Sequence, residues 1–455
     1  MRNVRVIAKA TFFQMVRMKV ALALIIILFA VIPYLALNIV GDGSLLGRLQ
    51  TFSSYALSLV SLILCLLTVT LSCFALSGDI KGMQIFNLIT KPVARYEILL
   101  GKFCGVMLLN TAFLVLFSGL VYLITMNIPR FTSPDRDELA RANDEFYIAR
   151  TAVLADFDEK AFKLKARDDY YRLRELEQLP RENMTLDQFV KGAVSRMKYG
   201  ESSVADGEVK RWTFRNIKPK AGDNYIYLRF KLEASSSPPD NMISGRWVVG
   251  DLRQMDNPQK EQTPIYDSYL RRDAIKVSHE LKIPSSTVAS DGIVNVEFQN
   301  VYNGTTIIPQ EIEVLYRSGS FGANFFKANL LILVRLFFLT ALGVALTTWL
   351  SFPVAFFVAV VIYITGSVHG FIFEAIDDLG TQAGIVYALT VKPLLYIMPS
   401  FDGDSNPAAM ILSARMISWL YIFKMFAITA VIKGGAMLGL GALIFNKREV
   451  AKVTV

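Results

Sequence analysis

The sequence predicts a polytopic α-helical membrane protein with six spans and an α+β extracytoplasmic insert, in which a helical part is followed by an antiparallel β-sandwich. Three observations predict this fold class. Apolar residues gather in six long runs, a charge-rich stretch separates the third run from the fourth, and the hydrophobic period within that stretch changes from helical to alternating. Hydrophobic residues make up 53% of the 455 residues and charged residues only 19%, a balance typical of membrane proteins.

Each apolar run supplies about the 20 residues that a helix needs to cross a bilayer. The six predicted spans are residues 20–40, 55–76, 103–126, 329–350, 353–373 and 416–445. We interpret the first run as a permanent span, because the apolar core of a cleaved signal peptide is usually shorter, at roughly 7 to 15 residues. Residues 1–127 therefore hold the first three spans, and residues 326–455 hold the last three.

The distribution of charge predicts the orientation. Residues 128–327 hold equal numbers of basic and acidic residues, so the whole net charge of +9 comes from the rest of the chain. Basic residues cluster before the first span, between the second and third spans, and after the sixth. The positive-inside rule assigns these segments to the cytoplasm. We expect a protein of the cell (inner) membrane with cytoplasmic N and C termini, an extracytoplasmic insert over residues 128–325, and no nucleic-acid partner.

Residues 2–19 precede the first span and place Val4, Ile7, Ala8, Phe12 and Met15 on one helical face. This pattern predicts an amphipathic helix at the inner membrane interface. All three cysteines fall in or beside predicted spans, so no disulfide is expected in the insert.

The first part of the insert, residues 128–206, has a helical composition. Apolar residues recur there about every seven positions, namely Leu139, Phe146 and Val153, then Phe157, Leu164, Tyr171 and Leu179. This period predicts one or two long amphipathic helices, interrupted at Pro180, that pack on the rest of the insert, on each other or on a partner chain.

The second part of the insert, residues 207–325, alternates with the period of a half-buried strand. Even-numbered residues from Ile226 to Leu232 are apolar, and residues 294–298 and 312–316 repeat the alternation. Turn sequences such as Asp291-Gly292 separate these runs. A β-sandwich of jelly-roll or carbohydrate-module type explains the pattern, although such a fold alone names no ligand.

Aromatic and histidine side chains of the insert have two interpretations. Tyr225 and Tyr227, with Trp212 or Trp247, would form a sugar-stacking platform if exposed, whereas burial under the helical half is the commoner fate of aromatic side chains. His279 shares a strand face with apolar residues, which favours a core or core-edge position over a metal site.

The sequence lacks the motifs of several common catalytic sites. It contains no GxxxxGK[ST], GxSxG, HExxH or CxxC, and it has only two His residues. Two glycosylation triplets, at Asn183 and Asn303, are short enough to arise by chance. We therefore expect a chain that is not an enzyme, carries no cofactor or metal of its own, and receives any energy from another subunit.

The connector between the second and third spans, residues 77–102, is charged and long for a simple turn. Ile85, Leu88 and Ile89 form an apolar helical stripe, and Lys91-Pro92 ends it, because proline disfavours helix in the preceding residue. A second helix restarts four residues after the proline. A helix, a turn and a helix on the cytoplasmic side would give a soluble motor a rigid element to push.

Three segments resemble type-2 ABC exporter permeases. KPVARYEILLGK (residues 91–102) is similar to the family's coupling region, which reads Lys-Pro, a small residue, Arg, apolar residues and Gly-Lys. VKPLLYIMPSFDGDSN (391–406) and LIFNKRE (443–449) are similar to the stretch before the family's last span and to its exit. The resemblance covers about residues 1–127 and 328–455. The connector departs from the family at its start, with Asp79 and Gly82-Met83 in place of Glu and Gly-Thr.

The resemblance implies the permease subunit of an ATP-driven exporter. It implies a pair of permeases, identical or not, and two separate ATPase subunits that bind ATP-Mg and dock on the connector. The coupling residues that it implies are Asp79, Lys91, Pro92, Arg95, Gly101 and Lys102. Lys91 and Arg95 are expected to contact the ATPase, and Pro92 to set the turn. Simple positive-inside anchoring would also explain the two cations.

Charges within the spans mark a second candidate site. Arg335 in the fourth span and Lys433 in the sixth lie in the outer half of the bilayer, and Glu374 follows the fifth span. Such residues usually face protein or water and mark function. They would attract an anionic lipid or polysaccharide along a substrate path, or Glu374 would pair with Arg335 while the cations snorkel.

The stretch 381–401 is apolar but interrupted by prolines, which predicts a re-entrant or interfacial segment on the outer side. Two other classes of protein stay open. A membrane-anchored extracytoplasmic binding or adhesion protein would use the β-sandwich to recognise a glycan or a partner protein, but it would need only one or two spans. A membrane-embedded enzyme would need clustered His, Asp or Glu in spans that hold almost none.

Overall fold

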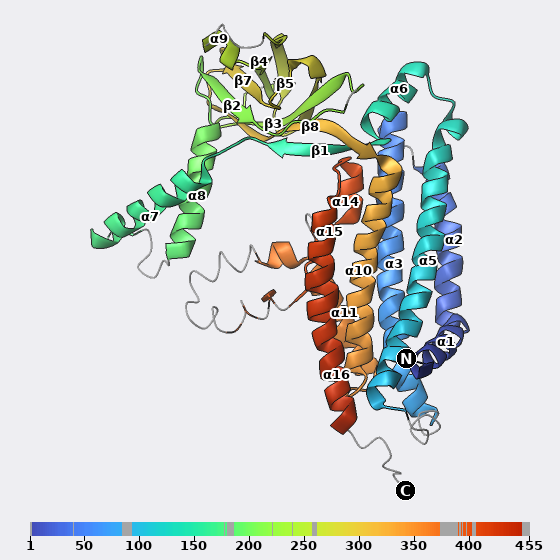
Figure 1. Cartoon of the computed structure of the whole chain (residues 1–455). Helices are drawn as coiled ribbons and strands as arrows, with labels where there is room; N and C mark the ends of the chain where they lie inside the picture. Colours follow the sequence, from blue (N-terminus) through green and yellow to red (C-terminus); the bar gives the residue numbers. More distant parts are fainter. Residues whose placement is uncertain are drawn as a thin grey trace. The chain divides into compact units, whose positions relative to one another are not determined.

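The computed structural model divides into two compact units, a helical unit (Met1–Ile148 with Ser320–Val455) and an insert (Ala149–Gly319) (Figure 1). It describes residues 2–39, 41–83, 93–176, 178–179, 186–220, 222–238, 240–256, 262–373, 390, 393, 395–396, 398–402 and 406–447.

The helical unit is built from helices of very different length. In chain order these are α1 (Arg2–Val16), α2 (Lys19–Asn38), α3 (Leu45–Lys81), α5 (Arg95–Thr132), α6 (Arg136–Glu145), α10 (Phe321–Leu346), α11 (Phe352–Ser367), α14 (Pro407–Leu412), α15 (Trp419–Met425), a π-helix (Phe426–Gly434) and α16 (Gly435–Lys447).

Five helices in the described part of the chain are long and apolar enough to cross a membrane. They are α2, α3, α5, α10 and the continuous helix Trp419–Lys447. Six were expected, and the fifth expected run forms α11, which has only 16 residues. The helix ends at Val368, between Gly366 and Gly370. The Gly366 carbonyl accepts from the Phe401 amide, and the Gly370 amide donates to the Asp402 carboxylate, so these two groups do not bond to each other as they would within a helix. Competition from these long-range bonds explains the shorter helix.

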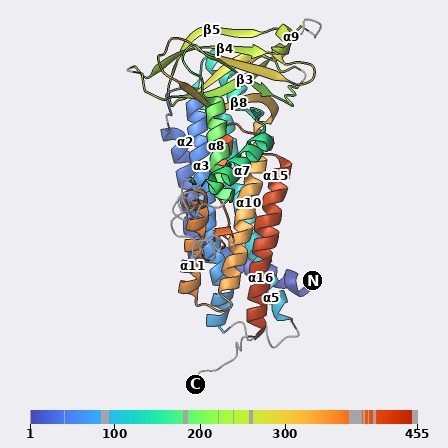
Figure 2. The ribbon, with the colours of Figure 1, turned by 90° about the vertical axis from the view of Figure 1, so that its left-hand side faces the viewer.

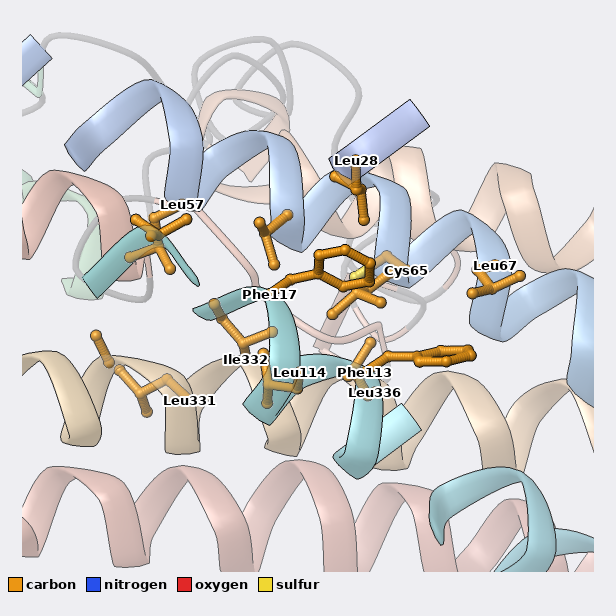
Figure 3. Packing of buried hydrophobic residues seen from close by; sticks show 14 of the residues in the cluster. Leu28, Leu57, Cys65, Leu67, Phe113, Leu114, Phe117, Leu331, Ile332 and Leu336 are labelled. Atoms are coloured by element: carbon orange, nitrogen blue, oxygen red, sulfur yellow. The ribbon is translucent and has the colours of Figure 1, made fainter. Parts of the chain in front are cut away.

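One apolar core joins the long helices, with α3 and α10 at its centre. Their most apolar stretches are 72% buried, whereas that of α2 is only 17% buried. Figure 3 shows side chains of α2, α3, α5 and α10 meeting in this core, among them Leu28, Cys65, Phe117 and Ile332. The helices in the middle are therefore held by neighbours, and α2 leaves most of its apolar surface uncovered.

The ends of several helices meet beside the connector, and we call this the connector end. Leu76, Leu99, Val344 and Phe445 form a small apolar cluster there. It joins the ends of α3, α10 and α16 to the start of α5, and α1 packs beside α5 (Figure 1).

At the other end of the helical unit, two hydrogen bonds join the start of α10 to the residues just before α15. Asn324 Nδ2 donates to the Arg415 carbonyl at 2.8 Å, and Lys327 Nζ donates to the Ile417 carbonyl at 2.9 Å. The chain therefore returns from the connector end to this opposite end between Leu346 and Trp419. The helix α11, which lies beside α3 in Figure 2, begins that return.

The insert contains two four-stranded sheets. Its elements are β1 (Ile148–Leu154), α7 (Glu159–Glu175), α8 (Leu186–Ser202), β2 (Val209–Phe214), β3 (Tyr225–Ala234), β4 (Met242–Gly250), α9 (Arg253–Asp256), β5 (Tyr266–Ala274), β6 (Ser278–Pro284), η1 (Ser285–Thr287), β7 (Val294–Asn300) and β8 (Ile307–Ser320). The strand orders are β1-β8-β3-β6 and β2-β7-β4-β5. The pairs β2–β7, β3–β6, β3–β8, β4–β5 and β4–β7 are antiparallel.

The alternation of apolar residues correctly predicted the inward faces of the strands. Ile226, Leu228 and Phe230 of β3 are fully buried and share one core with β7 and β8. Trp247 packs between Phe230 and Phe298, with ring centroids 4.2 and 4.6 Å away. The two sheets therefore enclose a single hydrophobic core.

The aromatic platform, the less favoured of the two interpretations, does not form. Trp212, Trp247 and Tyr227 are at most 7% exposed, and Trp247 lies between the sheets instead of under the helices. Only Tyr225 of the four aromatic residues is substantially exposed, with Lys282 Nζ 4.2 Å from its ring centre. A stacking surface needs several exposed rings, so the insert offers no such site on β3.

The helical interpretation of residues 128–206 is wrong at two points. Val153 lies in β1, a strand next to β8, because sheet pairing overrides the seven-residue spacing. Leu164 and Tyr171 of α7 are 63% and 52% exposed, whereas Ala166 and Tyr170 pack against α8. The helices α7 and α8 thus bury a different face from the one that the series predicted.

Candidate functional site

The connector begins at the end of α3 and finishes in the first turns of α5. Residues 84–92, with Lys91 and Pro92, lie outside the described residues, so their expected roles stay predictions. The other four expected coupling residues, Asp79, Arg95, Gly101 and Lys102, all lie at the connector end.

A buried ion pair joins the two ends of the connector. The Lys102 ammonium group contacts the Asp79 carboxylate, and each side chain is only 4% exposed. Gln14 of α1 bonds to both: its Nε2 donates to Asp79 Oδ1 at 3.1 Å, and its Oε1 accepts from Lys102 Nζ at 3.3 Å. These three contacts link α1, α3 and α5 to one another. We call Gln14, Asp79 and Lys102 the connector triad.

Two glycines let α1 approach α5 closely enough to complete the triad. A Cβ atom on Gly101 would lie 2.6 Å from Ile7, and one on Gly105 would lie 2.6 Å from the Ala8 carbonyl. The apolar face of α1 predicted from the sequence is present, but Ile7, Ala8 and Met15 bury it within the helical unit. Gly101 therefore has a packing role that the sequence alone did not reveal.

Arg95 joins the start of α5 to the end of the last helix. Its Nη1 donates to the carbonyls of Phe445 and Asn446 at 2.8 and 3.0 Å. Carbonyls in the last turn of a helix have no partner within the helix and carry partial negative charge, so a guanidinium group stabilises them. In the same first turn of α5, Glu97 accepts a hydrogen bond from Asn3 Nδ2 of α1 at 3.0 Å.

The pattern of hydrophobic faces in the sequence did not indicate Gln14 or Asn3. Both sit on α1 near residues that bury its apolar face, and their partners are 65 and 94 residues away. Polar residues that recur beside a buried helical face could have indicated such bonds. Their partners could not be identified without the packing.

The second candidate site surrounds Arg335. Arg335 Nη2 donates to the Phe401 carbonyl, and its guanidinium group lies 5.4 Å from the Phe401 ring centre. A cavity of about 190 Å³ adjoins it, lined by hydroxyl groups of α3 and α11 and by Asp402 and Asn406. The expected alternative partner, Glu374, lies outside the described residues.

Lys433 holds the same segment from another helix. It lies in the π-helix, a wide and uncommon helical form, and its Nζ donates to the Met398 carbonyl at 2.6 Å. On the other side, the Phe401 amide donates to the Gly366 carbonyl at 2.8 Å. Arg335 and Lys433 thus both satisfy carbonyls of the non-helical segment 398–402, which includes the last four residues of the expected re-entrant stretch 381–401.

Candidate residues of the insert have structural partners. His279 Nε2 lies 2.8 Å from the Ala274 carbonyl, at the edge of the core. Asn303 Nδ2 donates to the Ser244 carbonyl at 2.7 Å and to Asn300 Oδ1 at 2.6 Å. Its amide is thus engaged within the insert. No cluster of three His, Cys, Asp or Glu side chains suited to a metal occurs among the described residues.

Comparison with protein-family models finds no match to this chain, and comparison with curated proteins finds none either.

Proposed function

We propose that this chain is the permease subunit of an ATP-binding-cassette exporter, driven by a separate ATPase subunit that docks on the connector. One observation supports this proposal most strongly. Both ends of the connector are tied to the helical unit, by the connector triad and by the bonds of Arg95 to the last helix. A force on the connector would therefore reach four helices, α1, α3, α5 and α16.

The arrangement of the helix ends supports a six-span topology. The start of α5 and the ends of α3, α10 and α16 meet at the connector end, and α1 packs there on α5. An even number of crossings separates such segments. In this proposal α11 and the residues after it make the fifth crossing, and the basic connector end faces the cytoplasm of the inner membrane. Residues 128–325, which include the insert, are then extracytoplasmic.

The mechanism assigns a role to each group of residues. Lys91 and Arg95 contact the ATPase, Pro92 sets the turn, and Asp79, Gly101 and Lys102 transmit the movement to α1, α3 and α5. Two permeases, as a homodimer or a heterodimer, enclose the path. Arg335, Lys433 and Glu374 line or stabilise it, and an extracytoplasmic partner binds the insert. ATP-Mg is bound by the ATPase subunits, and this chain performs no bond chemistry.

Gentle purification combined with ATPase measurement tests the proposal. We expect an ATPase to copurify with the chain and its ATP hydrolysis to change when Lys91→Ala and Arg95→Ala are combined. Lys19→Ala removes an exposed cation at the first residue of α2; it is a matched control and should leave the rate unchanged. Because Arg95 also bonds to α16, Lys91→Ala alone separates docking from packing. Absence of an ATPase partner, together with unchanged hydrolysis, would reject the proposed function.

A further inference from the structure

A cavity of about 490 Å³ lies at the connector end, between the last turns of α3 and the turn that joins α10 to α11. Its walls are mainly apolar, with Phe74 and Ile80 on α3 and Leu350 and Phe352 on the other side. The rings of Phe74 and Phe352 meet edge to face, with centroids 6.3 Å apart. We call this cavity the α3–α11 groove.

The mouth of the groove carries positive charge. Lys81 lines it from the last turn of α3 and is exposed. Among the described residues, no carboxylate forms an ion pair with Lys81. The first turn of α11 also lines the groove, and Ser351 makes no side-chain capping bond to it. Amide groups in the first turn of a helix carry partial positive charge and favour anions, and in α11 these are the amides of Phe352 and Val354, because Pro353 has no N–H.

An exposed apolar stripe runs along α11, the helix whose first turn lines the groove. Val354, Phe357, Val361 and Ile364 follow one another at steps of three or four residues and are 43 to 67% exposed. In the turn that joins α10 to α11, between the lining residues Thr347 and Leu350, Trp349 is 54% exposed, and membrane proteins place tryptophan at the level of lipid headgroups. A ligand that fits these features has a negatively charged head and long apolar chains.

We propose that the α3–α11 groove binds an anionic phospholipid, with its phosphate near Lys81 and the first turn of α11 and its chains along the apolar stripe. This inference rests on the membrane topology of the proposed function, which places the groove in the cytoplasmic leaflet. Anionic lipids give the cytoplasmic leaflet a negative surface potential. The bound lipid lies between the end of α3 and the start of α11, next to the connector.

Quenching of Trp349 by brominated lipid tests the site directly. The Trp419→Phe chain is placed in phosphatidylcholine nanodiscs that contain a small fraction of either brominated phosphatidylglycerol or brominated phosphatidylcholine. Trp212 and Trp247 are buried in the insert, so Trp349 reports on the groove. At equal mole fraction we expect an apparent association about fivefold stronger for the anionic lipid, the effect of one cation near an anionic headgroup.

Two variants and one competitor make the result decisive. Lys81→Gln should remove the preference for the anionic lipid, whereas Lys19→Gln, which replaces a matched exposed cation, should keep it.

Equal quenching by both lipids would overturn the lipid site but leave the membrane topology intact. Loss of quenching on addition of soluble glycerol phosphate would also overturn it, because the site would then bind a free anion. No quenching by either lipid would overturn the topology itself, independently of the ATPase measurement.

Discussion

The helical unit and the insert use cations in different ways. In the helical unit Arg95, Lys327, Arg335 and Lys433 donate to backbone carbonyls. Two described cations of this unit bind side chains instead, since Lys102 pairs with the Asp79 carboxylate and Arg130 donates to Asn127 Oδ1. The insert instead pairs cations with carboxylates across its strands, as Arg211 does with Glu297 and Arg246 with Asp267.

The difference follows from which polar groups each unit leaves without a backbone partner. Helices that pack through apolar faces leave carbonyls without partners at their ends and at breaks, and a cation satisfies them. Strands satisfy their backbone groups in the sheet, so their charged side chains are free to pair with one another. Loss of a cation should release a backbone segment in the helical unit, whereas in the insert it should weaken only a shared side-chain network.

Breaking the buried Lys102–Asp79 ion pair of the helical unit should have the largest effect. Lys102→Met leaves the Asp79 carboxylate buried without its cation, and such a change typically costs about 3 to 5 kcal/mol. We expect a correspondingly lower thermal midpoint for the purified chain in detergent. The double variant Lys102→Met with Asp79→Leu should recover most of the loss, because well-packed apolar pairs often replace buried ion pairs without cost.

The same double variant separates stability from coupling. If the connector triad transmits movement, the restored chain should fold but should no longer change the ATP hydrolysis of a bound ATPase. Normal coupling in the double variant would show that the charge pair serves folding alone. A single variant as stable as the parent would contradict the burial of the pair.

Much of the insert's fold was predictable from alternation alone, because strand faces repeat every two residues and the core needs apolar side chains on one face. The faces of Ile226 to Leu232 follow this rule. Val153 was instead assigned to a helix, because a seven-residue spacing is also compatible with a short strand. Only the pairing of β1 with β8 decides between helix and strand there.

For the candidate sites the sequence offered residues but not their partners. Asp79 and Lys102 were expected as coupling residues from the resemblance of the connector, and their contact with each other and with Gln14 depends on how α1 packs. For Arg335 the sequence offered Glu374, whereas the described partner is the Phe401 carbonyl. Such carbonyls appear in every residue, so no sequence signal distinguishes the one that a cation will bind.

Crowding the contact between α1 and α5 should have an intermediate effect. Gly101→Val places a side chain against Ile7, where even a Cβ atom would lie at 2.6 Å, and overpacking of this kind typically costs about 1 to 3 kcal/mol. Gly119→Val on the same helix is the matched control, because no neighbouring atom lies within 4 Å of its Cβ position. Thermal midpoints should fall for the first variant and hold for the second; equal midpoints would contradict the close packing of α1.

The smallest effect is expected from the charge network of the insert. Glu280 on β6 accepts hydrogen bonds from Arg150 at 2.9 Å and from Arg229 at 2.6 and 2.8 Å, and Arg229 also bonds to Glu313 at 3.0 Å. Burial by itself raises the pKa of Glu280, but the charges and hydrogen bonds of Arg150 and Arg229 outweigh it and lower the pKa below its ordinary value of 4.5.

The sign of the pH dependence follows from that lowered pKa. The unfolded chain binds a proton on Glu280 more readily than the folded chain, so the network contributes its full stability above about pH 4.5 and loses it as the pH falls through the lowered pKa. Urea unfolding of the full chain, followed by the fluorescence of Trp212 and Trp247 in a Trp349→Phe and Trp419→Phe background, measures this loss. Glu280→Gln should flatten the decline, because the glutamine side chain carries no titrating charge. An unchanged slope in that variant would show that other carboxylates of the insert, and not the Arg150–Glu280–Arg229 network, set its acid sensitivity.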